Sequence, residues 1–279
     1  MLKTRIITAV VLLVLFLGAL FYLPPLGWAA FVTAIAVIAA WEWGGLLLLG
    51  SAPRLALCAL VFVCCAAIGL WQPGALGLGA DFGQASWLVG RLLYLPAGIF
   101  WACVVPFWMR GRWRLSQPII GSMVGLVVLL PTWLALIQLK QAGGGAGLLA
   151  VMAIVWVADI AAYFCGRRFG RRKLAPSISP GKTWEGAIGA TFAVVAYGFF
   201  LSYCFPKVVT VNHLAFVLIL VAVTAISVVG DLFESLLKRQ AGLKDSGSIL
   251  PGHGGVLDRI DSLTSTLPLV ALVWLLNQS

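Results

Sequence analysis

The stretch from Ser235 to Asp261 holds the densest group of chemically reactive side chains in the chain. It combines lysines, arginines, aspartates, one histidine and five glycines within a sequence that is 62% hydrophobic and only 10% charged. Charged side chains in so apolar a setting are functional candidates by default, because leaving them unpaired away from water is costly. This stretch is therefore the first candidate for an active site.

The helix that should lead into this stretch places three reactive groups on one face. Asp231, Ser235 and Lys238 are spaced i, i+4 and i+7, so their side chains align if the helix continues that far. Glu234 can also reach Lys238 at i+4. A carboxylate beside a hydroxyl suits a hard cation such as Mg²⁺, and a lysine suits phosphate. The alternative is an ordinary solvated helix end.

A glycine-rich turn and two aspartates follow. Gly254 and Gly255 come directly after His253, and glycines let backbone N–H groups approach a phosphate closely. Asp258 and Asp261 are spaced i, i+3 and can point the same way as the last helix begins. Their alternative role is to cap that helix, whose N-terminus favours negative charge.

A second basic segment runs from Gly166 to Gly186 and is typical of a polyanion-binding surface. Ser179, Pro180 and Gly181 predict a turn, and a helix should begin near Thr183 or Trp184 with its N–H groups open to an anion. Lys182 and Thr183 do not complete a P-loop, because the required glycine five residues before Gly181 is Pro176.

Long apolar runs must position these segments, and they indicate an integral membrane protein. The mean hydropathy of the 279 residues is +1.04, and about 20 apolar residues suffice to cross a bilayer. We expect an all-α bundle of about nine transmembrane helices. They cover residues 6–23, 27–49, 55–71, 86–108, 118–139, 147–165, 184–204, 212–233 and 262–277. We expect one membrane domain over 1–279, with N-terminal spans in 1–139 and the catalytic spans and loops in 147–279.

The distribution of basic residues predicts the orientation of this bundle. With a cytoplasmic N-terminus, 16 of the 19 Lys and Arg residues fall in cytoplasmic segments, and only Lys140 and Lys207 fall in outer ones. This is the positive-inside pattern, and it places the C-terminus outside. Since topology accounts for the net charge of +10, the charge gives no reason to expect a nucleic-acid partner.

Three acidic residues fall within or at the edge of predicted spans, toward the cytoplasmic end. They are Glu42, Asp159 and Asp231. Intramembrane acids are candidates for function, and the alternative is an interhelical salt bridge or hydrogen bond, which we favour for Glu42. The six cysteines all lie in apolar runs without ligand spacing, so we interpret them as buried hydrophobic residues. Carboxylates for metal and two basic loops for phosphate together favour phosphoryl or nucleotidyl transfer.

These motifs resemble a known family. The pattern Ser235-x2-Lys238-Arg239-x4-Lys244-Asp245-x7-His253-Gly254-Gly255-x2-Asp258-Arg259-x-Asp261 is similar to the signature of the phosphatidate cytidylyltransferase (CDP-diacylglycerol synthase) family, and the segment from Ser179 to Gly186 resembles its second shared block. One departure is Asp159-Ile160-Ala161-Ala162-Tyr163, where the family has a sequence closer to DTGAY. A close backbone approach at that helix is therefore in doubt.

The resemblance implies transfer of CMP from CTP to phosphatidic acid, dependent on Mg²⁺, with release of pyrophosphate. It also implies a second cation such as K⁺, a homodimer, and a bacterial inner membrane with the site facing the cytoplasm. Catalytic roles are implied for Asp231, Lys238, Asp258 and Asp261. Metal binding is implied for Asp231, Asp258 and Asp159. Substrate binding is implied for Ser179, Lys182, Thr183, Ser235, Arg239, Lys244, His253, Gly254, Gly255 and Arg259. The alternatives are a cytidylyltransferase for another lipid phosphate and a secondary transporter, although the inverted repeats of a transporter are not evident.

Overall fold

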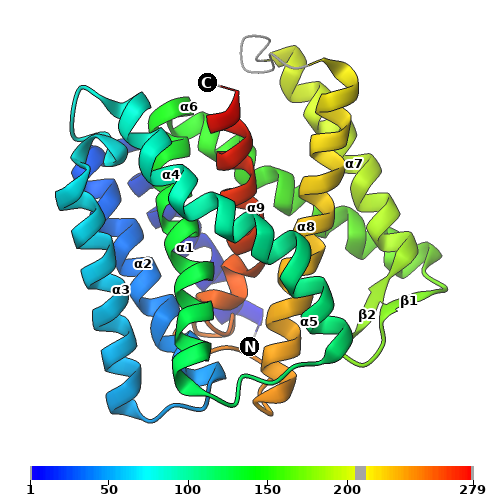
Figure 1. The fold of residues 1–279 in the computed structure, drawn as a ribbon. Coiled ribbons are helices and arrows are strands. Elements are labelled where there is room, and N and C mark those ends of the chain that lie inside the picture. The colour runs from blue at the N-terminus through cyan, green and yellow to red at the C-terminus, as the bar shows by residue number, and fades with distance from the viewer. Residues whose placement is uncertain (1, 205–211, 278–279) are drawn as a thin grey trace.

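The protein folds into a bundle of helices with one short β-hairpin (Figure 1). The computed structural model describes residues 2–204 and 212–277, with side chains from Ile6 onward. The predicted outer residue Lys207 lies outside the described residues. The helices are α1 (Leu2–Tyr22), α2 (Pro25–Leu46), α3 (Ser51–Trp71), the 3₁₀ turn η1 (Pro73–Leu76), α4 (Phe82–Ile99), the π-helical turn η2 (Phe100–Val104), α5 (Val105–Gly111), α6 (Pro118–Phe169), α7 (Trp184–Cys204), α8 (His213–Gln240) and α9 (Leu257–Leu276). The hairpin pairs β1 (Lys173–Ala175) with β2 (Ser179–Thr183).

The expected all-α membrane architecture is confirmed. Within the described residues, seven helices are long and apolar enough to cross a membrane. One of them, α6, has 52 residues, about 78 Å at the rise of an α-helix, which is more than twice the thickness of a hydrocarbon core. Its backbone leaves the helical conformation at Gly144 (φ 68°, ψ −177°), and only glycine adopts such angles readily. The segments 118–139 and 147–165, expected as separate spans, are thus the two arms of one interrupted helix. The total of nine spans stays a prediction.

The basic segments gather at one end of the bundle. In Figure 1 the start of α1, the turn between α2 and α3, the connection from α5 to α6, the hairpin and the loop after α8 all lie toward the lower end, and the end of α9 lies at the upper end. This arrangement agrees with the predicted topology, in which successive loops alternate between the two faces of the membrane. The side of a membrane that each end faces remains a prediction.

Two boundaries differ from those expected. The helix α9 begins at Leu257 rather than near residue 262, so Asp258 and Asp261 belong to its first two turns. The residues Ser179 to Gly181, expected to form a turn, begin strand β2, and the chain reverses just before them at residues 176–178. The prediction missed the hairpin because a short strand carries little periodic signal.

The C-terminal part of α8 is held by aromatic packing. Phe233 is almost fully buried, and its ring meets those of Phe100, Trp101 and Trp108 edge-to-face, with centroids 5.6–5.8 Å apart. Such pairs stabilise packing beyond simple area burial. At the end of the helix, Gln240 donates to the carbonyl oxygen of Trp113 at 2.9 Å. These contacts fix the part of α8 that carries the predicted catalytic face.

Candidate active site

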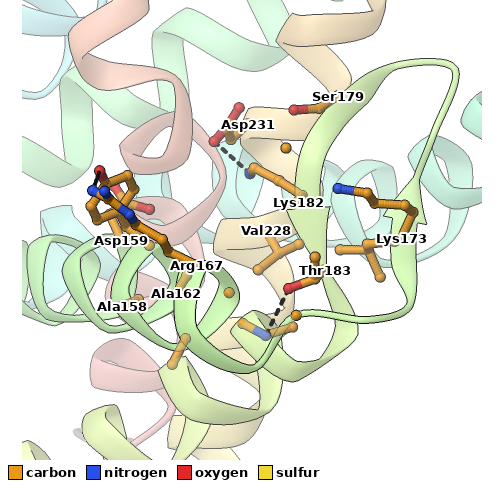
Figure 2. Close-up of a pocket in the computed structure, with 18 of the residues that line it drawn as sticks. Ala158, Asp159, Ala162, Arg167, Lys173, Ser179, Lys182, Thr183, Val228 and Asp231 are labelled. Carbon is orange, nitrogen blue, oxygen red and sulfur yellow. Dashed lines mark hydrogen bonds and ion pairs between the residues drawn. The ribbon is translucent and has the colours of Figure 1, made fainter.

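A cavity of about 490 Å³ lies between the second arm of α6, the β-hairpin, the start of α7 and α8. Most of the wall is built from small residues, because α6 and α7 pack closely there. A Cβ on Gly186, for example, would stand 2.8 Å from the carbonyl oxygen of Ala162. The polar lining residues are Asp159, Tyr163, Arg167, Lys173, Ser179, Lys182, Thr183, Ser227 and Asp231. Figure 2 shows most of them converging on the same space from different elements.

Asp231 is held from both sides in this cavity. Lys182 on β2 forms an ion pair with its Oδ2 at 2.5 Å (Figure 2). The Ser235 hydroxyl donates to its Oδ1 at 3.2 Å. The second bond confirms that α8 continues and aligns Asp231 with Ser235. Through these two bonds, the Asp231 carboxylate connects Lys182 of the basic segment from Gly166 to Gly186 with Ser235, the first residue of the Ser235–Asp261 stretch.

The hairpin that carries Lys182 is fixed at its base by side-chain caps. Glu185 accepts hydrogen bonds from the backbone N–H groups of Arg171 and Arg172 at 3.0–3.2 Å, and the Thr183 hydroxyl accepts from Gly186 N–H at 3.1 Å. The expectation that the start of α7 offers free N–H groups to an anion is therefore wrong at Gly186. Thr183 lines the cavity, but its oxygen already serves as this cap.

A second polar cluster lies one to two turns further along α8. Lys238 forms ion pairs with Asp258 Oδ1 at 2.7 Å and with Glu234 Oε1 at 3.3 Å. Its side chain is only 12% exposed, and each of the two carboxylates is 5% exposed. The nearness of Glu234 and Lys238 at i, i+4 confirms the predicted pair. Lys238 is therefore held between two buried carboxylates rather than projecting into the cavity.

Asp258 also organises the loop before α9. Its Oδ2 accepts from Ser246 N–H at 2.8 Å, from the Ser246 hydroxyl at 2.9 Å and from Gly255 N–H at 2.8 Å. With Oδ1 bound to Lys238, both oxygens meet donors. Metal binding by Asp258 remains a prediction, and the contacts found here are those of a residue that positions the loop.

Glu42 caps the start of α9 from the far side of the sequence. Its carboxylate accepts from Val256 N–H at 3.0 Å, from Leu257 N–H at 2.7 Å and from the Ser246 hydroxyl at 3.3 Å. The interhelical hydrogen bonding favoured for this residue is confirmed. Capping of this helix was the alternative role considered for Asp258 and Asp261. Among the residues that the structure describes, the Asp261 carboxylate accepts a hydrogen bond only from the adjacent Ser262 N–H, at 2.7 Å.

Asp261 lies near both polar clusters. It is close enough to Asp231, Asp159 and Lys238 for its charge to interact with theirs. The close crossing of α8 and α9 brings it there, since a Cβ on Gly230 would stand only 2.3 Å from the Ser265 hydroxyl. The three aspartates thus form an acidic region beside the cavity.

The fit of a metal to this region can be judged from the donors. In the described parts of the chain, no group of three or more His, Cys, Asp or Glu side chains is arranged to hold a metal ion. Mg²⁺ is commonly bound by only one or two carboxylates together with water and substrate phosphates. Asp231 and Asp159, both on the cavity wall, fit that mode.

The remaining predicted residues lie around the loop between α8 and α9. Arg239, Lys244 and Arg259 are exposed. His253 is half-buried, and its Nδ1 meets no hydrogen-bond partner among the described residues. Gly254 adopts a positive φ of 79°, and Gly255 packs against Ser246 and the carboxylate of Glu42. The structure brings these residues near Asp258, and their contacts with substrate remain predictions.

Several residues of the site were not predicted individually from the sequence. Ser246 and the full role of Glu42 were not foreseen, because their partners are distant in the sequence or lie in an irregular loop. Arg167 and Lys173 line the cavity but were expected only as members of the basic, polyanion-binding segment from Gly166 to Gly186. Their place in the same basic segment as Lys182 was the available signal.

Comparison with known proteins identifies the family of the chain. The cytidylyltransferase family matches residues 3–276 of the chain. The phosphatidate cytidylyltransferase of Pseudomonas aeruginosa is 43% identical over 280 residues, which cover 98% of this chain and 97% of that protein. The corresponding proteins of Haemophilus influenzae and Brucella suis are 36% and 35% identical over 284 residues, covering 96% and 97% of this chain and 96% and 92% of their own lengths. The chain therefore belongs to the cytidylyltransferase family.

Proposed function

We propose that this protein is a phosphatidate cytidylyltransferase, which makes CDP-diacylglycerol and pyrophosphate from CTP and phosphatidic acid. The lipid phosphate oxygen attacks the α-phosphorus of CTP, a new P–O bond forms, and the bond to the β-phosphate breaks as pyrophosphate leaves. Family membership and the names of the full-length relatives support this assignment over transport.

The observation that carries the proposal is the ion pair of Lys182 and Asp231 on the wall of a cavity within an apolar bundle. A lysine can bind phosphate and a carboxylate can bind the metal that phosphoryl chemistry requires. Mg²⁺ held there by Asp231 and Asp159, with the substrate phosphates, would neutralise charge on the triphosphate. In-line phosphoryl transfer depends mainly on such positioning and charge neutralisation.

Two basic clusters suit a reaction with two phosphate-bearing substrates. One consists of Lys173, Lys182 and Arg167 on the cavity wall, and the other consists of the exposed Arg239, Lys244 and Arg259 around the loop between α8 and α9. Each cluster can hold one substrate while the metal-binding carboxylates of the cavity stand near the reacting phosphates. We propose that both clusters face the cytoplasm from the inner membrane. K⁺ and a homodimer remain implications of the resemblance.

The test is a detergent-solubilised assay with radiolabelled CTP and phosphatidic acid, with and without Mg²⁺. The expected result is metal-dependent label in the lipid phase, together with release of pyrophosphate. The Asp231→Asn variant should lose at least a hundredfold in turnover. Absence of a labelled lipid from the wild-type protein would refute the proposal. A parallel arm with an isoprenoid phosphate tests the second candidate, another lipid phosphate, which predicts product only in that arm.

A further inference from the structure

The carboxylate of Glu42 is buried at a place where three donors converge on it. The residue lies near the end of α2, between two tryptophans, and is only 2% exposed. Two of its donors are the backbone N–H groups of Val256 and Leu257, at 3.0 and 2.7 Å, where α9 begins. A buried charge requires such compensation, and hydrogen bonds to charged groups are stronger than neutral ones.

The start of α9 needs an acceptor from elsewhere. The first N–H groups of a helix have no partner within it, and they are usually satisfied by the side chain of the N-cap residue. That residue here is Val256, which has no side-chain oxygen and makes no cap. Glu42 supplies the acceptor and places a negative charge at the positive end of the helix dipole. Asp258 follows in the same first turn, so this cap fixes its position.

Ser246 connects Glu42 to Asp258. Its hydroxyl lies 3.3 Å from Glu42 Oε2 and 2.9 Å from Asp258 Oδ2. The Ser246 hydroxyl is thus within hydrogen-bond distance of both carboxylates. Because a hydroxyl has one hydrogen to donate, it donates to one of them at a time. The backbone N–H of Ser246 adds a further bond to Asp258. The loop between α8 and α9 is therefore held by hydrogen bonds to Glu42 and to Asp258.

Two glycines of the loop make this approach possible. A Cβ on Gly247 would stand 2.5 Å from Glu42 Oε1, and one on Gly255 would stand 2.5 Å from Oε2. Real Cβ atoms do not approach so closely, so any larger residue would displace the carboxylate or the loop. Close packing of this kind at both glycines indicates that the position of Glu42 is closely tied to the conformation of the loop.

We propose that Glu42 is a positioning residue for the reaction. It holds the loop of residues 246–256 and the start of α9, so that Asp258 stays bound to Lys238 and Asp261 stays near Asp231 and Asp159. The effect on turnover rests on the proposed function, whereas the hold on the loop does not. Glu42 itself lies behind the loop and is absent from the lining of the described cavity.

The test compares Glu42→Gln with the wild-type protein in two measurements. Glutamine keeps the shape of the side chain but loses the charge and one acceptor oxygen. Amide hydrogen exchange should accelerate in the peptide that contains Val256 and Leu257. We expect kcat to fall at least tenfold while the KM of each substrate changes less than threefold, since a misplaced group fails mainly in the transition state. Glu42→Gln should lower kcat by a smaller factor in the Ser246→Ala background than in the wild-type protein, because both substitutions disturb the same hydrogen-bonded bridge.

A matched control separates positioning from general stability. Asn212 caps α8 at the opposite end of the bundle by accepting from Ala215 N–H at 2.8 Å. Asn212→Ala should lower Tm by an amount comparable to Glu42→Gln and leave kcat unchanged. The proposal is overturned if Glu42→Gln keeps kcat within twofold, if exchange at Val256 and Leu257 is unaltered, or if Asn212→Ala loses as much activity. A wild-type protein without cytidylyltransferase activity would refute the proposed function, while the exchange data would still decide whether Glu42 holds the loop.

Discussion

Replacing Lys182 by methionine tests whether its ammonium binds a substrate phosphate. In the structure this ammonium pairs with Asp231, and both side chains are about a quarter exposed (26% and 25%). Solvent screens an ion pair of that kind, so it contributes about 0.5–1 kcal/mol to stability. For a protein of this size the loss corresponds to a fall in Tm of about 1–2 °C.

The loss of activity should be much larger than the loss of stability. A hydrogen bond to a charged group contributes about 1.5–3 kcal/mol. At 1.36 kcal/mol for each factor of ten, this corresponds to a loss of about 10- to 150-fold in kcat/KM. The assay follows labelled CDP-diacylglycerol while CTP and phosphatidic acid are varied separately. The substrate whose KM rises is the one whose phosphate Lys182 contacts.

The control is the same substitution at the other end of the bundle. Lys140 donates to the carbonyl oxygen of Leu23 at 2.9 Å and lies over the Trp28 ring, so Lys140→Met should lower Tm and leave kcat/KM unchanged. The reasoning about Lys182 is refuted if Lys182→Met stays within threefold of the wild type for both substrates. It is also refuted if, in both Lys182→Met and Lys140→Met, the loss of kcat/KM is simply proportional to the fall in Tm.

Two glycine substitutions test the packing of the site. Gly230→Ala places a Cβ 2.3 Å from the Ser265 hydroxyl, so α8 and α9 must separate. Thermal unfolding in detergent should show a destabilisation of about 1–3 kcal/mol. An unchanged Tm would contradict the close crossing of the two helices. Gly254→Ala and Gly242→Ala both place alanine at a positive φ, 79° and 71°, and should lose similar stability. Only the first sets a Cβ 2.8 Å from Asp258 Oδ2, whereas nothing lies within 4 Å of a Cβ at Gly242. Turnover should therefore fall at least tenfold in Gly254→Ala alone, and equal activity of the two variants would contradict a role for Asp258.

Local periodicity in the sequence predicted much of the catalytic face. The alignment of Asp231 with Ser235 and of Glu234 with Lys238 follows from the 3.6-residue repeat of a helix, and the structure confirms both contacts. The apolar runs likewise predicted most helices, because burial in a bilayer requires such runs. These features depend only on residues that are near one another in the chain.

Contacts between distant residues could not be predicted in this way. The bond from Leu257 N–H to Glu42 joins positions 215 residues apart, and no local pattern specifies it. The start of α9 was placed too late for the same reason, since its cap comes from another helix. The ion pair between Lys182 and Asp231 could not be predicted from the sequence either, although each residue was predicted separately as part of the site.

The cap at Glu42 changes the role of the N-terminal spans. Residues 1–139 contain none of the family motifs and could be regarded as an anchor for a catalytic region in 147–279. Yet Glu42 supplies the acceptor that the first turn of α9 lacks, and its carboxylate fits only because Gly247 and Gly255 leave room for it. The loop that bears Asp258 therefore depends on α2 for its shape. Since Asp258 in turn holds Lys238, the N-terminal spans take part in building the site, as the predicted single membrane domain requires.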